Sequence, residues 1–165
     1  MALIRNFERT DYHRVCEIYQ AGIDTGFATF ETQTKDWDTW DASAMKEARL
    51  VALNESNEVI GWACLSAVTN RCVYTGVAEI SVYVDPKAQG KGVGGQLLGG
   101  LVLGSEEAGV WTLQARIFPE NMASIALHLK LGFREVGKQE RLGQLHGVWR
   151  DIVMLERRST LVGTD

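Results

Sequence analysis

A glycine-rich segment at residues 89–95 carries the clearest chemical signal in the sequence. It stands where a predicted strand and a short loop give way to a predicted helix. Glycines let a backbone approach a ligand closely, and the free N–H groups at the start of a helix, with the helix dipole behind them, favour an anion. The segment therefore predicts a pyrophosphate site that needs no basic surface. Its residues are Gln89, Gly90, Lys91, Gly92, Val93, Gly94 and Gly95.

Other interpretations of this segment fit less well. It matches the dinucleotide pattern GxGxxG, but that fold places the first glycine at the end of the strand and an acidic residue about 20 positions onward. Here residues 85–89 intervene and no acid fits. A P-loop would need Gly-Lys-Ser or Gly-Lys-Thr. A merely flexible loop does not explain why glycines continue at Gly99, Gly100 and Gly104, where each costs about 1 kcal/mol against alanine, so close packing of the helix is the better explanation.

Gln89, Gly92 and Gly94 fill the pattern Gln or Arg, x, x, Gly, x, Gly or Ala, and with it the sequence resembles the GNAT superfamily of acetyltransferases. The resemblance covers nearly the whole chain and is closest to the branch of phosphinothricin and methionine sulfoximine N-acetyltransferases. It implies a GNAT fold, an α/β domain whose mixed central sheet of about six to seven strands is flanked by about four helices. Further segments that look like this branch are residues 29–32 (TFET), 71–79 (RCVYTGVAE), 81–84 (SVYV), 121–128 (NMASIALH), 131–133 (LGF) and 146–149 (HGVW).

The resemblance implies direct transfer of acetyl from acetyl-CoA to the amino group of a small amino-acid-like acceptor, of the phosphinothricin, methionine sulfoximine or methionine sulfone type, in a ternary complex. Such transfer needs a base, a donor that polarises the thioester carbonyl, and a proton source for the thiolate. Glu79 matches the family's catalytic carboxylate and is expected to take the ammonium proton, directly or through one water; an exposed strand carboxylate is the structural alternative. Backbone N–H groups near Val82 and Val84 are expected to hold the carbonyl.

Two histidines are further catalytic candidates. His128 stands where many relatives carry a tyrosine proposed to protonate the thiolate, and histidine titrates in a suitable range; a packed helix residue is the structural alternative. His146 matches a histidine of the branch considered catalytic or substrate-orienting. Asn121 resembles a cofactor-contacting residue and is equally suited to cap its helix. Cofactor contacts are also expected from Tyr83 and Ser124.

The acceptor is expected to meet a second group of residues. Arg71 and Tyr74 match the branch's Arg, x, x, Tyr, and an arginine could hold an amino-acid carboxylate with two parallel hydrogen bonds. Phe30 is expected either to wall the same pocket or to anchor its loop as a core aromatic, and Ser81 to contact the substrate. Relatives of this branch often pair with their sites near the interface, so the resemblance also implies a homodimer.

The pattern of apolar residues predicts the elements that position these groups. Helical spacing and caps predict one helix capped at residue 10 or 11, one running from residue 34 or 36 towards 48, one ending near 109 and one over 121–131. No segment repeats and no linker divides the chain, so residues 1–158 are expected to form one domain and residues 159–165 a C-terminal tail. Strands are predicted at residues 3–7, 49–53, 59–68, 76–84, 111–118, 133–139 and 148–156.

Composition excludes several function classes. The chain has 165 residues and a net charge of -4 without a long basic run, so nucleic acid is not expected as a partner. Its start is too polar for a signal peptide and no apolar stretch approaches the roughly 20 residues that span a bilayer, so we expect a cytoplasmic protein without membrane contact. Cys16, Cys64 and Cys72 are odd in number and lack paired spacing, and the histidines are scattered, so neither disulfides nor a metal site are expected.

Three alternative functions remain open at this point. An acetyltransferase for a peptide N-terminus, a polyamine or a drug would share the cofactor motif, although Arg71 and Tyr74 favour small amino acids. A non-catalytic sensor of acetyl-CoA would keep the glycine segment, but Glu79 and His146 argue against it. A nicotinamide-dependent oxidoreductase rests on the formal glycine match alone and would bind NAD without affinity for CoA.

Overall fold

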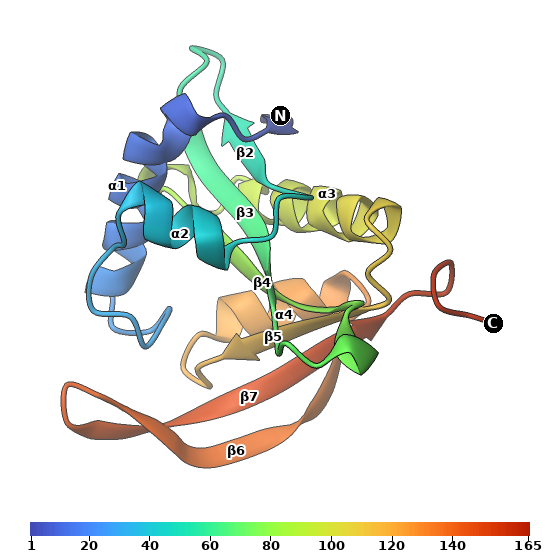
Figure 1. Cartoon of the computed structure of the whole chain (residues 1–165). Helices are drawn as coiled ribbons and strands as arrows, with labels where there is room; N and C mark the ends of the chain where they lie inside the picture. The colour runs from blue at the N-terminus through green and yellow to red at the C-terminus, as the bar shows by residue number, and fades with distance from the viewer.

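The computed structural model describes all 165 residues as a sheet with helices on both faces (Figure 1). The strand order across the sheet is β1-β2-β3-β4-β5-β7-β6. The strands are β1 (Leu3–Asn6), β2 (Leu50–Leu53), β3 (Val59–Ala67), β4 (Val77–Val84), β5 (Thr112–Ile117), β6 (Arg134–Leu145) and β7 (Val148–Arg158). The helices are α1 (Tyr12–Asp24), α2 (Trp37–Ser43), α3 (Val93–Glu107) and α4 (Met122–Lys130), with short 3₁₀ turns at Arg9–Asp11, Cys72–Tyr74 and Pro86–Ala88. The predicted mixed α/β fold is confirmed.

The sheet opens between two neighbouring strands near its middle. β4 and β5 run parallel, whereas all other neighbouring strands run antiparallel. The two parallel strands pair over residues 77–79 and 112–114 alone, while β4 continues to Val84 beside β3. Past Glu79, the edge of β4 that faces β5 therefore has no strand partner, and a ligand can reach its backbone there.

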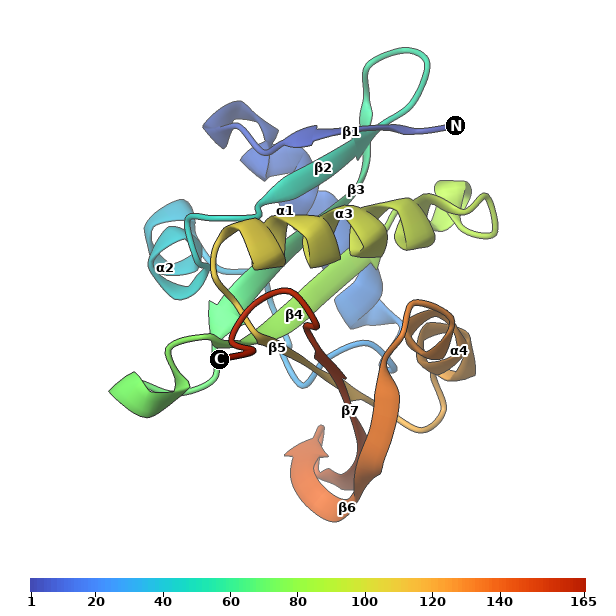
Figure 2. The same cartoon turned by 90° about the vertical axis from the view of Figure 1, so that its right-hand side faces the viewer.

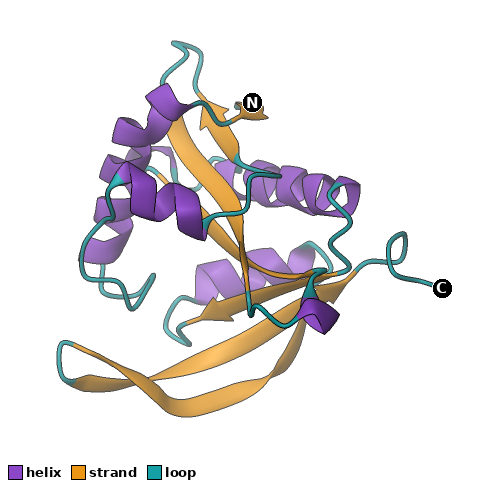
Figure 3. Cartoon of the chain, viewed as in Figure 1, coloured by secondary structure: helices purple, strands orange, loops and turns teal.

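Two helices cover each face of the sheet, as the views in Figures 2 and 3 show. On one face, α3 buries Leu97 and Leu101 against the sheet, and α4 lies on the same side. On the other face, α1 buries Val15 and Ile18, and α2 buries Trp40. Because successive side chains of a strand point to opposite faces, β3 and β4 contribute alternately to the two cores.

Helix α2 is shorter than the sequence predicts. Asp36, one of the two predicted caps, caps its first turn, but the helix ends at Ser43 rather than near residue 48. Ala44 is extended, with a ψ of 136°. The guanidinium of the buried Arg49 donates hydrogen bonds to the carbonyls of Ala44 and Met45 at 2.7 and 2.6 Å. These side-chain donors satisfy the carbonyls that a further helical turn would have paired, so the chain can leave the helix early.

The last two strands form a hairpin that is longer than predicted. His146 and Gly147 alone connect β6 to β7, and both have positive φ, at 50° and 77°. Two positive φ values are typical of a type I′ turn, whose twist suits paired strands. The sequence pattern predicted the earlier strand only to residue 139, but an irregularity of pairing between Gln139 and Gly143 absorbs the break in alternation and the strand continues.

The segment after β7 begins with an anchored residue. Ser159 is buried; its hydroxyl donates to the Glu106 carboxylate at 2.9 Å and its N–H donates to the Trp111 carbonyl at 2.8 Å. Residues 160–165 follow without helix or strand. None of the helices combines the length and the apolar character that crossing a membrane requires.

Candidate active site

A cleft of about 1070 Å³ enters the molecule where β4 and β5 separate. It runs from the glycine segment past Glu79 to the loop that precedes α2. The predicted site residues that do not line it are Lys91, Arg71, Tyr74 and His146. The others do line it, namely Phe30, Glu79, Ser81, Val82, Tyr83, Val84, Gln89, Gly90, Gly92, Val93, Gly94, Gly95, Asn121, Ser124 and His128.

The backbone N–H groups of the glycine segment are free to bind a ligand. From Gly90 to Gly95, none of them donates a hydrogen bond within the chain. Gly90 and Gly92 have positive φ, 75° and 81°, and α3 begins at Val93, so these groups form an anion-binding concavity at a helix N-terminus. No atom lies within 4 Å of an added Cβ at Gly90 or Gly92, which means that backbone conformation, rather than crowding, requires glycine there.

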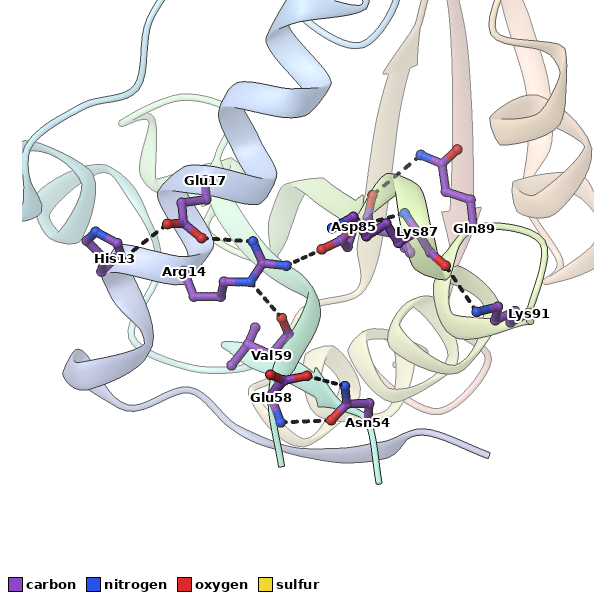
Figure 4. A network of polar contacts seen from close by, with 11 residues as sticks. His13, Arg14, Glu17, Asn54, Glu58, Val59, Asp85, Lys87, Gln89 and Lys91 are labelled. Atoms are coloured by element: carbon purple, nitrogen blue, oxygen red, sulfur yellow. Dashed lines mark hydrogen bonds and ion pairs between the residues drawn. The ribbon is translucent and has the colours of Figure 1, made fainter. Parts of the chain in front are cut away.

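A network of polar contacts fixes the loop before the first glycine (Figure 4). Arg14 on α1 donates to the Asp85 carboxylate and, through Nε, to the Val59 carbonyl at 3.1 Å. Asp85 is buried and also accepts a hydrogen bond from the Lys87 N–H at 2.8 Å. Lys91 donates from Nζ to the Lys87 carbonyl at 3.0 Å. These contacts tie α1 and β3 to the loop that leads into α3.

The free edge of β4 presents two N–H groups to the cleft. Just after the strand, the Asp85 N–H donates to the Ile60 carbonyl of β3 at 2.8 Å. Since successive N–H groups of an extended chain point to opposite sides, those of Val84 and Val82 point away from β3 and towards the gap beside β5. A carbonyl oxygen in this gap would meet backbone donors, which is the arrangement expected of a site that stabilises a developing oxyanion.

Glu79 lies on the wall of the cleft, at the last position where β4 pairs with β5. Its side chain is 31% exposed. Burial raises the pKa of this carboxyl, and Arg116 of β5, whose Nη1 lies 3.5 Å from the nearer carboxylate oxygen, opposes the rise. A carboxylate with a raised pKa accepts a proton more readily than a fully solvated one, so both position and environment suit a general base.

Beyond Glu79 the cleft is walled by aromatic and small side chains. The rings of Trp62 and Tyr83 stack with centroids 5.0 Å apart, and Tyr19 packs edge-on against Tyr83 at 4.8 Å. Cys64 lies opposite Ser81 on the neighbouring strand. Burial raises the pKa of the Cys64 thiol to about 12, so this thiol is protonated at neutral pH and is a poor nucleophile.

The start of α4 forms the other side of the cleft. Asn121 caps this helix by accepting a hydrogen bond from the Ser124 N–H at 3.3 Å. Nδ1 of His128 lies 2.6 Å from the Ser124 carbonyl. Because a carbonyl oxygen only accepts, Nδ1 carries the proton, and Nε2 of a neutral His128 has none to donate. Burial lowers the pKa of His128, although the hydrogen bond to Ser124 opposes this, so the protonated form that the predicted acid role needs is disfavoured.

The residues predicted around the acceptor lie in separate places. Phe30 lines the cleft and packs edge-on against Phe118, with ring centroids 4.9 Å apart. Arg71 and Tyr74 are exposed on the turn between β3 and β4, where the guanidinium carbon lies 5.3 Å from the centroid of the Tyr74 ring. His146 is exposed in the turn of the β6–β7 hairpin. Within one chain, Arg71, Tyr74 and His146 are therefore not brought together with Glu79.

Several residues of the cleft were not predicted from the sequence. Arg116 is the most notable, because its guanidinium faces the carboxylate of Glu79. Glu31 and Lys35 also line the cleft and form an ion pair at 3.2 Å. The available signal for Arg116 was a charged residue between the apolar residues Ala115 and Ile117 of the predicted strand. That signal predicts a strand, but it does not say which strand lies next to it.

Comparisons with known proteins agree with this geometry. Residues 12–133 match the sequence model of the Acetyltransferase (GNAT) family. The L-amino acid N-acyltransferase MnaT of Escherichia coli is 31% identical, with 93% of this chain and 91% of that protein covered. The L-methionine sulfoximine/L-methionine sulfone acetyltransferase of Salmonella typhimurium is 30% identical, with 93% and 92% covered. The crystal structure of a phosphinothricin acetyltransferase from Sinorhizobium meliloti, in complex with AcCoA, superposes with a TM-score of 0.87 at 32% identity and covers 99% of this chain and 91% of its own.

Proposed function

Because the chain belongs to the acetyltransferase (GNAT) family, we propose that it transfers the acetyl group of acetyl-CoA to the amino group of a small amino acid. The observation that carries the proposal is the order of groups along one cleft. Free N–H groups of the glycine segment come first, the unpaired edge of β4 follows, and Glu79 comes next. An anion site, a carbonyl-binding edge and a base in succession are what direct acyl transfer to an amine requires.

The residues of the cleft fit acetyl-CoA, the co-substrate that supplies the thioester. The N–H groups from Gly90 to Gly95 and the positive end of the α3 dipole match a pyrophosphate. Asn121 and Ser124 line the opposite wall. The relative from Sinorhizobium meliloti with AcCoA bound supports the same co-substrate here.

One side chain and two backbone N–H groups take part in the proposed transfer. Glu79 takes a proton from the acceptor ammonium, which frees the nitrogen lone pair for attack. The N–H groups of Val82 and Val84 hold the carbonyl oxygen while negative charge develops on it. The proposed transfer is direct, within a ternary complex, and the one thiol that lines the cleft agrees with it, because burial keeps Cys64 protonated and makes it a poor acyl carrier.

The departing thiolate needs a proton, and the hydrogen bonding of His128 argues against its neutral form as the source. Nδ1 of this residue is committed to the Ser124 carbonyl. The acceptor nitrogen must lose a second proton once it has been acylated, and that proton can reach the thiolate without passing through His128. We therefore assign to the His128 ring a packing role, edge-on against Phe133 with centroids 5.1 Å apart.

A homodimer is part of the proposal. The β6–β7 hairpin exposes apolar side chains that a monomer leaves in water, including Val148 (61%) and Trp149 (56%). Pairing through this hairpin would cover them. Light scattering after size-exclusion chromatography should give twice the chain mass, and Trp149→Glu should shift the measured mass to that of the monomer.

The proposed location is the cytoplasm. Three free cysteines, of which Cys72 is exposed, agree with a reducing compartment of this kind.

The test of the function is CoA-thiol release from acetyl-CoA with a panel of acceptors. The panel holds free amino acids, methionine sulfoximine, methionine sulfone, phosphinothricin, a polyamine and a peptide. Turnover with one or more amino-acid-like acceptors supports the proposal. Turnover confined to the polyamine or the peptide would contradict the acceptor class, and acetyl-CoA binding without any turnover would indicate a sensor instead.

A further inference from the structure

The cleft contains one cation that faces the proposed base. The charged side chains that line the cleft are Glu31, Lys35, Glu79, Arg116 and Glu120. Of the two cations, Lys35 is paired with Glu31 at 3.2 Å. Arg116 has Glu79 as its nearest carboxylate, at 3.5 Å, and makes no hydrogen bond with it. The side chain of Arg116 is 43% exposed, so its guanidinium donors are available to a ligand.

The strand geometry explains why Arg116 faces the opening. Gln114 of β5 lies opposite Glu79 of β4 in the last parallel pair. Side chains two residues apart on a strand share a face, so Arg116 lies on the same face as Gln114 and one step further along, where β4 has already diverged. Its flanking residues Ala115 and Ile117 are buried on the opposite face, and this fixes the direction of the Arg116 side chain.

We propose that Arg116 binds the carboxylate of the acceptor amino acid while Glu79 receives a proton from its amino group. This inference rests on the proposed function and names the recognition element of its acceptor. An α-amino acid carries its ammonium and its carboxylate on the same carbon atom, and adjacent carboxylate and guanidinium groups present the complementary charges side by side. An arginine can also bind a carboxylate through two parallel hydrogen bonds, which orients the amino group as well as attracting it.

Arg71, which the sequence favoured for this role, is placed differently. It lies on an exposed turn, with its guanidinium over the ring of Tyr74, and it does not line the cleft. Arg116 acts from the same wall as Glu79. The two arginines therefore make a matched pair for experiment, since each can be replaced by methionine, which keeps an apolar stem of similar length without the charge.

The experiment compares two acceptors, L-methionine sulfone and the amine that remains when its carboxyl group is replaced by hydrogen. Arg116→Met should raise KM for methionine sulfone about 10- to 100-fold, the effect expected for losing hydrogen bonds to a charged group. At a pH well above the acidic limb, where Glu79 is deprotonated in both enzymes, kcat/KM should fall far more for methionine sulfone than for the decarboxylated amine. An unaltered KM for acetyl-CoA would show that the variant is folded. Arg116→Lys should recover part of the affinity, because it restores the charge but not the paired hydrogen bonds.

Other outcomes would overturn the inference. An equal loss with both acceptors would mean that Arg116 acts on Glu79 or on the structure rather than on the carboxylate. No loss with either acceptor, or a selective loss in Arg71→Met instead, would assign the carboxylate elsewhere. A wild-type enzyme that acetylates no amino acid would remove the proposed function itself, an outcome visible before any variant is made.

Discussion

The contact between Arg14 and Asp85 should control how tightly the protein holds acetyl-CoA. Replacing Arg14 by methionine removes ion pairs to Asp85 and to the exposed Glu17, and a hydrogen bond to the Val59 carbonyl (Figure 4). The side chain of Asp85 is 10% exposed and would keep only the Lys87 N–H as a partner. Breaking a fully buried pair costs about 3–5 kcal/mol and an exposed pair about 0–1. Because Arg14 is 38% exposed, we expect an intermediate loss of about 1–2 kcal/mol.

The contacts that would be lost hold the loop that leads to the glycine segment, so this loop would be destabilised. If the loop must be ordered again on binding, 1–2 kcal/mol corresponds to a rise of about 5- to 30-fold in KM for acetyl-CoA, with KM for the acceptor unchanged. The assay is CoA-thiol release at saturating acceptor. Arg157→Met is the matched control, because Arg157 pairs with the similarly shielded Glu106 at 3.0 Å near the other end of α3. An unchanged KM for acetyl-CoA in Arg14→Met, or an equal rise in the control, would refute the reasoning.

Three further predictions follow from the site. Gly92→Ala puts a Cβ on a residue with a φ of 81°, at a cost of about 1–2 kcal/mol, and should raise KM for acetyl-CoA without lowering the yield of folded protein, as thermal unfolding and titration can check. Burial raises the pKa of Glu79 and Arg116 lowers it, so kcat/KM should fall as the pH drops through that pKa. Arg116→Met should move this acidic limb to higher pH. An unmoved limb would mean that Arg116 does not influence the base. His128→Phe should change kcat less than tenfold if the ring only packs, whereas a loss of the size typical for a general acid, about 100-fold or more, would restore the acid role.

Local sequence signals predict which segments form helices and strands and where the glycine segment lies, but not every boundary. Gln89 to Gly92 lie between β4 and α3, and Val93 to Gly95 begin that helix, as their spacing predicts. Asp36 is one of the two caps that the sequence offers for α2. The end of α2 was missed because the Arg49 side chain donates hydrogen bonds to carbonyls that a further helical turn would have paired. Helix propensity does not include such contacts between a side chain and the backbone. The full length of β6 was missed because an irregularity in pairing is a property of two strands together.

Those residues of the candidate site that lie together in one segment of the sequence could be proposed from a resemblance in that segment. Glu79, Val82 and Val84 follow one another on β4, so a resemblance in that segment identifies all three. The partner of Glu79 could not be found in this way. Arg116 lies next to Glu79 because β4 and β5, which are separated in the sequence by α3, pair in parallel. The spacing of residues in the sequence does not reveal the register of that pairing. For the same reason, the sequence could not tell that Arg71 lies outside the cleft of its own chain.

The most direct test of the account is the rate of CoA-thiol release from acetyl-CoA with methionine sulfone, measured in the wild type and in Glu79→Gln. The substitution keeps the shape of the side chain and removes its ability to take a proton. We expect kcat to fall by about 100- to 10,000-fold while acetyl-CoA still binds, because general base catalysis contributes a factor of that size. A Glu79→Gln enzyme that turns over within a few-fold of the wild type would contradict the assignment of Glu79 as the base at the centre of this cleft.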